Sequence, residues 1–308
     1  MVPAAEEVAV WTKFEHAFTS MKNYSDPLYD VKRFAVTFTA PSGSTKTVRG
    51  FWDGGVEWKV RFMPGEIGEW SFVSECSDGG NAGLNGVRGS FKCIGNDSPL
   101  AIHARGGIVR RDGAYHLSHA DGTPFFWLGD TAWNGALMST PGEWERYLGH
   151  RAKNGFSVIQ FVTTEWRGCA GDREGGRAIE GCGHIAVNID FFRRLDEKID
   201  RINDHGLVAA PVLLWALHFI TGRYLSPGYY LPQEEAVLLA RYMVARYGGN
   251  HVIWILGGDG KYVDEFEQRW KVIGRGVFGD GEHQGLVTTH PMGRSWYGDV
   301  YRDEGWLD

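Results

Sequence analysis

Long apolar runs and an excess of positive charge are both missing from this sequence. No run approaches the ~20 apolar residues that a membrane-spanning helix needs, so we expect no membrane association. The formal net charge is -6; general nucleic-acid binders are usually basic, so we expect no nucleic-acid partner. Residues 1–7 lack the basic and apolar regions of a signal peptide. The sequence as given therefore predicts a cytoplasmic protein. If the N-terminus is processed or incomplete, we expect a secreted or periplasmic protein instead.

Cysteine is scarce, with four residues in two pairs, Cys76 with Cys93 and Cys169 with Cys182. Neither pair has the CxxC spacing that is typical of zinc sites, so we expect no bound metal. Either pair could form a disulfide in an exported protein. Without a signal sequence, we favour four free thiols.

Residues 1–97 show β-rich segments and no helical periodicity. Glycine, proline, aspartate and asparagine separate the segments, which are residues 8–18, 33–39, 45–52, 58–63, 70–74 and 87–94. Short strands with frequent turns predict an accessory β-sandwich domain over residues 1–97. Residues 96–99 form a short linker, and Trp52, Trp58 and Trp70 offer apolar surface. We therefore expect the sandwich to dock on the next domain through these rings.

Residues 98–308 alternate between apolar strands and amphipathic helices. The predicted strands are residues 124–130, 156–162, 207–215, 252–256 and 286–290. Thr140, Pro141 and Glu143 have the spacing of a capping box and predict that the first helix begins at Pro141. Five strand–helix alternations with short links are typical of a parallel α/β domain.

The turn after the first of these strands, residues 128–133, matches neither the dinucleotide-binding motif nor the P-loop. We therefore expect no nucleotide cofactor and favour a (β/α)8 TIM-type barrel over a doubly wound sheet. Such a barrel usually takes ~250 residues, and residues 98–308 supply only five repeats. The sequence predicts a multi-domain protein: an all-β sandwich, then an incomplete barrel truncated after the fifth strand.

The predicted strand ends carry polar and aromatic side chains. The polar set is Asp130, Glu165, His218, Asp259 and His290, with Trp133, Trp166 and Trp215 beside it and Arg294 just downstream. In a barrel, these residues would converge on the carboxyl-terminal mouth. Each one alone has a simpler structural interpretation, such as a helix cap, an ion pair or a hydrogen-bonding spacer. Their convergence favours a site.

Carboxylates with tryptophans in a barrel mouth indicate glycoside hydrolysis, which needs a proton donor and a second carboxylate. On this hypothesis Asp259 is catalytic and the remaining residues bind a carbohydrate substrate. A metal-dependent hydrolase is an alternative, because His218, Asp259 and His290 could be ligands. We rank it lower, because the first strand lacks an HxH pair. A non-catalytic carbohydrate-binding protein is the other alternative.

Four barrel motifs, residues 127–133, 154–160, 253–259 and 288–291, resemble the apiosidase-like glycoside hydrolase family. Residues 49–53, 58–64 and 68–70 resemble the uncharacterised β-sandwich domain that often precedes such barrels. The resemblance implies a (β/α)8 barrel related to the large retaining clan, acting on plant or microbial polysaccharide or oligosaccharide. It also implies that Asp259 is the acid/base, although many relatives in the clan have Asn-Glu where this chain has Gly258-Asp259. The nucleophile is implied on the seventh strand, downstream of residue 308.

Overall fold

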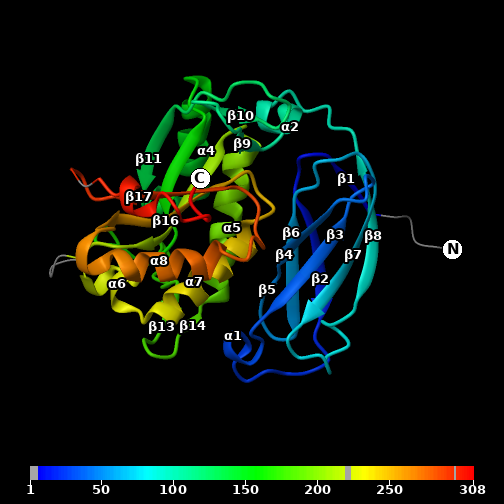
Figure 1. Ribbon diagram of the computed structural model, residues 1–308, viewed down its shortest axis with the longest axis horizontal. Helices are drawn as coiled ribbons and strands as arrows, with labels where there is room; N and C mark the ends of the chain where they lie inside the picture. The colour runs from blue at the N-terminus through cyan, green and yellow to red at the C-terminus, as the bar shows by residue number, and fades with distance from the viewer. Residues whose placement is uncertain (1–5, 219–222, 295) are drawn as a thin grey trace.

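The computed structural model describes residues 6–218, 223–294 and 296–308 (Figure 1). Its N-terminal part is built of strands in two sheets. The first sheet has the order β1-β8-β7-β3-β4 and the second the order β2-β6-β5. The strands are β1 (Glu6–Ala9), β2 (Phe14–Thr19), β3 (Phe34–Thr39), β4 (Thr45–Arg49), β5 (Phe51–Trp52), β6 (Glu57–Phe62), β7 (Gly68–Cys76) and β8 (Arg88–Ile94). Stacked aromatic pairs join the sheets, with ring centroids 4.0 Å apart for Phe14–Phe91 and 4.1 Å apart for Phe38–Phe62.

The prediction of one strand over residues 8–18 is wrong. β1 pairs in parallel with β8, whereas β2 pairs antiparallel with β6, so the chain crosses from one sheet to the other between them. The crossing occurs at Trp11, whose backbone has a φ of 62°. A Cβ added to Gly65 or Gly106 would lie 2.6 Å from the Trp11 ring. Packing against these two glycines, rather than local β propensity, decides where the strand breaks.

The C-terminal part contains a five-stranded sheet in the order β11-β12-β15-β16-β17. All four pairings are parallel, as predicted. The strands are β11 (Gly129–Trp133), β12 (Val158–Val162), β15 (Val208–Trp215), β16 (Ile253–Gly260) and β17 (Leu286–Pro291). The long helices are α4 (Pro141–Lys153), α5 (Ile189–Asp204), α7 (Gln233–Tyr247) and α8 (Glu267–Phe278).

Shorter elements connect these units. The helices are α1 (Pro27–Asp30), α2 (Ala101–Arg105), α3 (Gly135–Met138), α6 (Pro227–Tyr230) and α9 (Gly298–Tyr301), with 3-10 turns η1 (Arg223–Leu225) and η2 (Asp264–Phe266). Two small hairpins are β9 (Ile108–Arg110) with β10 (Leu117–His119) and β13 (Ile179–Glu180) with β14 (Ala186–Val187). The first hairpin and α2 lie where the chain passes from the sandwich to the α/β part (Figure 1).

The predicted capping box is confirmed at the start of α4. Thr140 Oγ1 accepts a hydrogen bond from the Glu143 backbone, and Glu143 Oε2 accepts one from the Thr140 backbone at 2.8 Å. Both contacts satisfy amides that have no partner inside the helix. Residues three apart therefore determine this helix start without help from the rest of the fold.

The first barrel strand begins later than predicted. β11 starts at Gly129; before it, Phe126 is 77% and Trp127 40% exposed, whereas Phe125 is buried. β11 is an edge of the sheet, so no strand of the described part covers that side. An apolar run was interpreted as a buried strand, but only the strand pairing shows which residues enter the sheet.

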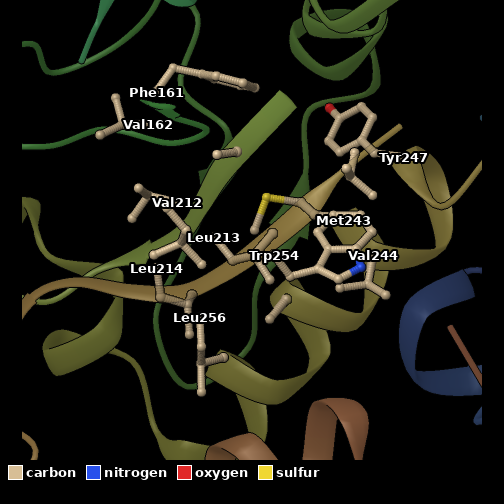
Figure 2. Packing of buried hydrophobic residues seen from close by; sticks show 14 of the residues in the cluster. Phe161, Val162, Val212, Leu213, Leu214, Met243, Val244, Tyr247, Trp254 and Leu256 are labelled. Carbon is tan, nitrogen blue, oxygen red and sulfur yellow. The ribbon is translucent and has the colours of Figure 1, made fainter. Parts of the chain in front are cut away.

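Helix α7 covers the outer face of the sheet. Met243, Val244 and Tyr247 pack toward side chains of β15 and β16, such as Leu213 and Trp254 (Figure 2). All of these side chains are at most 4% exposed. Because strand residues alternate between faces, the residues between them point to the inner, concave face. Together with Leu286 and Thr288 of β17, Ile253 and Ile255 line a cavity of about 320 Å3 there.

The sandwich docks on the α/β part, as predicted, but charged groups make most of the hydrogen bonds between them, and the three predicted tryptophans are not the main contacts. Trp58 and Trp70 belong to the core of the sandwich itself, and Trp52 packs against that core. Phe51 is the sandwich ring that joins the core of the α/β part. Around it, Arg246 of α7 bonds Asp53 Oδ1 at 2.8 Å, and Arg61 of β6 bonds Asp196 Oδ2 at 2.9 Å.

Candidate active site

Asp259 lies at the carboxyl end of β16, between two cationic or polarised groups. Its Oδ1 is 3.5 Å from His290 Nε2, and its Oδ2 is 3.8 Å from Arg167 Nη2. The Asp259 side chain is 24% exposed, so it is accessible to a ligand. The carboxylate is therefore held between an imidazole of β17 and a guanidinium of the loop after β12.

The orientation of His290 is set from its other side. Gln160 Nε2 lies 3.2 Å from His290 Nδ1. An amide NH2 only donates hydrogen bonds, so Nδ1 accepts and the ring proton of the neutral imidazole resides on Nε2. That proton faces Asp259. Gln160 thus orients the Nε2 edge of His290 toward the acid, 3.5 Å away.

Backbone strain marks the same region. Trp133, Asp259 and Arg294 have φ values of 40°, 52° and 67°, in a region that side chains other than glycine seldom occupy. The strand pairings also shift register beside Trp133 in β11 and around Asp259 in β16. Bulges of this kind re-aim side chains, and such strain collects at functional sites.

The two glycines before Asp259 allow close packing beneath it. A Cβ at Gly258 would lie 2.7 Å from the Trp215 ring, and one at Gly257 would lie 2.6 Å from Tyr262 Oη. Any larger residue at position 258 would collide with Trp215. The Gly-Gly pair and the buried tryptophan therefore depend on each other.

The three predicted tryptophans form one cluster. Trp166 and Trp215 have ring centroids 4.8 Å apart, and Trp133 lies 5.3 Å from each. Trp166 and Trp215 are only 6% and 1% exposed, whereas Trp133 is half-buried. The Trp133 ring also meets His290 edge to face at 5.4 Å. Trp133 is therefore the ring open to a ligand, and the other two support it.

Asp130 does not join this cluster. Its Oδ2 accepts hydrogen bonds from Tyr147, at 2.7 Å, and from Arg151, both on α4. Asp130 thus faces the helix side of the sheet, because it lies within β11 rather than at its tip. Although burial opposes ionisation, the bonds from Tyr147 and Arg151 lower the pKa of Asp130. The structure places it as an ionised structural group.

Glu165 lies after β12, at the carboxyl end of the sheet as predicted, but it has no exposed surface. Its Oε1 accepts hydrogen bonds from Tyr230 Oη at 2.7 Å and from Arg177 Nη2 at 3.0 Å. The carboxylate anchors the loop that carries its neighbours Trp166 and Arg167. Its Oε2 is buried and has no hydrogen-bond partner among the described residues.

His218 and Arg294 lie at the margins. The His218 ring is near Tyr229 and Phe266, with centroids 6.1 and 5.8 Å away. Arg294 is exposed, three residues beyond β17.

Asp259 and His290 come together, but the described residues contain no group of three side chains able to hold a metal ion. In the same part of the chain, all four cysteines are free thiols and no helix is long and apolar enough to cross a membrane.

Gln160 and Arg167 contact the site residues directly, yet sequence reasoning did not single them out. Gln160 had a detectable signal, because it interrupts the apolar run of β12. Arg167 had none, since only the fold of its loop carries it over the Trp166 ring, 5.8 Å from the centroid, and toward Asp259.

Two sequence profiles match the chain. The profile described as the apiosidase-like catalytic domain matches residues 111–308, and that of a domain of unknown function, DUF5060, matches residues 7–77. No curated protein matches the sequence.

Solved structures share the fold. A Bacteroides vulgatus ATCC 8482 protein assigned to the glycoside hydrolases has a TM-score of 0.76 and 23% identity, over 97% of this chain and 58% of its own. A family 5 glycoside hydrolase from the same organism has a TM-score of 0.55 and 22% identity, over 66% and 43%. A third, described as a glycoside hydrolase, has a TM-score of 0.53 and 24% identity, over 67% and 45%. The chain thus spans about half the length of the proteins it resembles, and five parallel strands with their helices match part of a glycosidase-type barrel.

Proposed function

This chain belongs to the apiosidase-like family of glycoside hydrolases, and we propose on that premise that Asp259 is the acid/base of a glycosidase acting on plant or microbial polysaccharide or oligosaccharide. One observation carries the proposal. Asp259 sits at the tip of β16 in a strained backbone conformation, and its two oxygens face His290 and Arg167. Strain maintained at an accessible carboxylate supports a functional role.

The geometry suits a proton donor whose charge changes during the reaction. Protonated Asp259 donates its proton to the glycosidic oxygen as the bond to the sugar breaks. The resulting carboxylate is stabilised by the Nε2–H of His290 and by the Arg167 guanidinium, both already in place. Charge that develops beside preoriented donors costs little reorganisation. The carboxylate then accepts a proton from the attacking water in a retaining enzyme.

The reaction also needs a second carboxylate. Neither of the other predicted acids is placed to serve, because Asp130 is held by α4, and Glu165 has no exposed surface and its Oε1 is held by Arg177 and Tyr230. We expect the partner on polypeptide that closes the barrel between β17 and β11. It should stand ~5–5.5 Å from Asp259 in a retaining enzyme and ~6.5–9.5 Å away in an inverting one.

Sugar contacts follow from the same geometry. Trp133 offers the open ring on which a sugar face can stack, with Trp166 and Trp215 packed behind it. Arg294 is exposed beyond β17, and we assign it a role in binding hydroxyls with His290. We propose for His218 only an outer position in the site, beside Tyr229.

The test is the Asp259→Asn variant of the natural protein, assayed on aryl glycosides with good and poor leaving groups. Loss of the acid should reduce kcat/KM ~10²–10⁴-fold for poor leaving groups and far less for good ones, which depart without protonation. Asp264→Asn is a matched control, because Asp264 also has a positive φ, 56°, and lies on the surface, paired with Lys261.

An equal loss on both substrates would contradict the assignment of Asp259. Unchanged activity in the Asp259 variant would do the same. A protein that binds the oligosaccharides but hydrolyses none, with or without Asp259, would favour the non-catalytic alternative.

A further inference from the structure

A cavity of about 150 Å3 lies between the sandwich and α7, away from Asp259. Its sandwich wall contains Phe34, Phe51, Trp52 and Trp58, and its α7 wall contains Arg241 and Tyr242. Rings from two parts of the chain therefore face one cavity. Ligand pockets of this kind combine apolar walls with a few polar groups and often form at domain interfaces.

Positive charge predominates in the lining. Lys32, Arg33, Arg49 and Arg241 are cationic, and Glu234 is the acidic residue among the lining side chains. Arg33 and Arg49 are paired with Glu282 and Asp280 outside the lining, so the charge that remains poorly compensated is that of Lys32 and Arg241. An anionic ligand would find complementary charge here.

Arg241 has the weakest pairing of the three arginines in the lining. Its Nη2 lies 3.5 Å from Asp280 Oδ2, but Arg49 Nη2 holds the same oxygen at 2.7 Å. Arg241 Nε is buried and has no hydrogen-bond partner among the described residues. Burial and the nearby Arg49 lower the pKa of Arg241, although the charges of Asp280 and Glu282 act in the opposite direction. A buried donor without a partner is costly, and an acceptor group of a ligand would remove that cost.

The aromatic wall supplies the other half of a sugar site. Trp52 is partly buried, and its indole N–H bonds the Gly55 carbonyl at 3.0 Å, which holds the ring in place. Trp58 is 4% exposed, and its indole N–H has no partner within the described part of the chain. Fixed rings with free donors nearby suit a sugar, which presents a C–H face and many acceptor oxygens.

We propose that this cavity is a second carbohydrate site, which binds a sugar bearing a carboxylate, that is a uronic acid unit. The ring stacks on Trp52, and the carboxylate is bound by Arg241, whose planar guanidinium can pair with both oxygens. The site lies at the junction of the two domains and gives the sandwich a role in retaining acidic glycans. This proposal does not depend on the role of Asp259.

Titration calorimetry at low salt with D-glucuronate tests the proposal, with D-glucose and acetate as matched probes. We expect a Kd of ~1 mM for glucuronate, as befits a single small ligand, and at least ~10-fold weaker binding of glucose and acetate. Trp52→Ala and Arg241→Gln should each weaken glucuronate binding ~10-fold or more, whereas Arg241→Lys should retain part of it. Arg88→Gln, an exposed arginine on β8, is the control and should bind like the unmodified protein.

Each remaining outcome decides against the proposal. If acetate binds as tightly as glucuronate, the cavity is a site for anions only. If glucose binds as tightly as glucuronate, the carboxylate of the ligand contributes nothing. Glucuronate binding that survives Trp52→Ala but is lost in Asp259→Asn would place the sugar in the barrel mouth. Thermal unfolding of each variant establishes that it is folded. Because the two variants lie in different domains, a folding defect in one leaves the other decisive.

Discussion

Gln160 and His290 touch across three strand spacings. Gln160 is on β12 and His290 on β17, with β15 and β16 between them, yet Nε2 and Nδ1 are 3.2 Å apart. In a flat sheet, three spacings would separate the two strands by ~14 Å. The contact exists because the sheet curves as a barrel does, which brings both side chains to the inner face beside one cavity.

Gln160→Leu tests the importance of this contact. Without the amide, the tautomer and orientation of His290 are no longer determined, so we expect kcat to fall roughly 10-fold, a part of the ~10²–10⁴ that acid–base catalysis supplies. KM should change little. Stability should change little, because the His290 side chain is 33% exposed and water can replace the lost hydrogen bond. Gln268→Leu on the exposed face of α8 is the control; equal effects from the two variants would count against a positioning role.

Arg246→Met tests the charged junction between the domains. Arg246 is fully buried and bonds both Asp53 and Asp196, the latter at 2.7 Å. Its removal leaves two buried carboxylates with reduced compensation, which should cost ~3–5 kcal/mol of unfolding free energy. Arg201→Met is the matched control, because Arg201 is 61% exposed and pairs only with Asp204. Chemical denaturation measures both, and a cost below ~1 kcal/mol for Arg246 would show that the junction is dispensable.

His251 should make stability depend on pH. Burial lowers the pKa of His251 to about 4, from 6.5 in the unfolded chain. As the pH falls below 6.5, the unfolded state takes up the proton first, so stability present above pH 6.5 is lost progressively toward pH 4. The loss should reach ~3 kcal/mol. Burial also lowers the pKa of His283 to about 4, so this residue adds a similar loss.

Denaturant unfolding at pH 7.5, 6 and 5 measures this effect. The free-energy difference between the unmodified protein and His251→Gln should shrink as the pH falls, because glutamine does not titrate. His150→Gln, at an exposed position of α4, should leave the slope unchanged. A constant difference across the range would mean that His251 is not buried in its neutral form.

Tyr230→Phe isolates one hydrogen bond to the buried Glu165. Burial and the charge of Glu165 raise the pKa of Tyr230, so the hydroxyl remains a donor. Removing it leaves a buried carboxylate with Arg177 as its remaining partner, at a cost of ~1–3 kcal/mol. Tyr224→Phe, on a 69% exposed tyrosine, should change stability little. Thermal unfolding compares the two; equal Tm values would contradict the anchoring role of Glu165.

Local signals in the sequence determined several features of this protein. The capping box of Thr140 and Glu143 depends on residues three apart, and the apolar stripe of α5 depends on helical periodicity. Five alternations of strand and helix were sufficient to predict a parallel sheet. The motifs around Trp133 and Asp259 indicated the family.

Only the tertiary structure decided which predicted side chains meet. β11 begins at Gly129, so Asp130 falls within the strand and faces α4 rather than the mouth. In a strand, a shift of one residue exchanges the two faces, and the apolar residues that precede β11 do not reveal the register. Glu165 lies at the predicted end of the sheet but is covered by Arg177 and Tyr230, which come from later segments. Arg167 and Gln160 reach Asp259 and His290 across the curved sheet, and sequence periodicity carries no information about curvature.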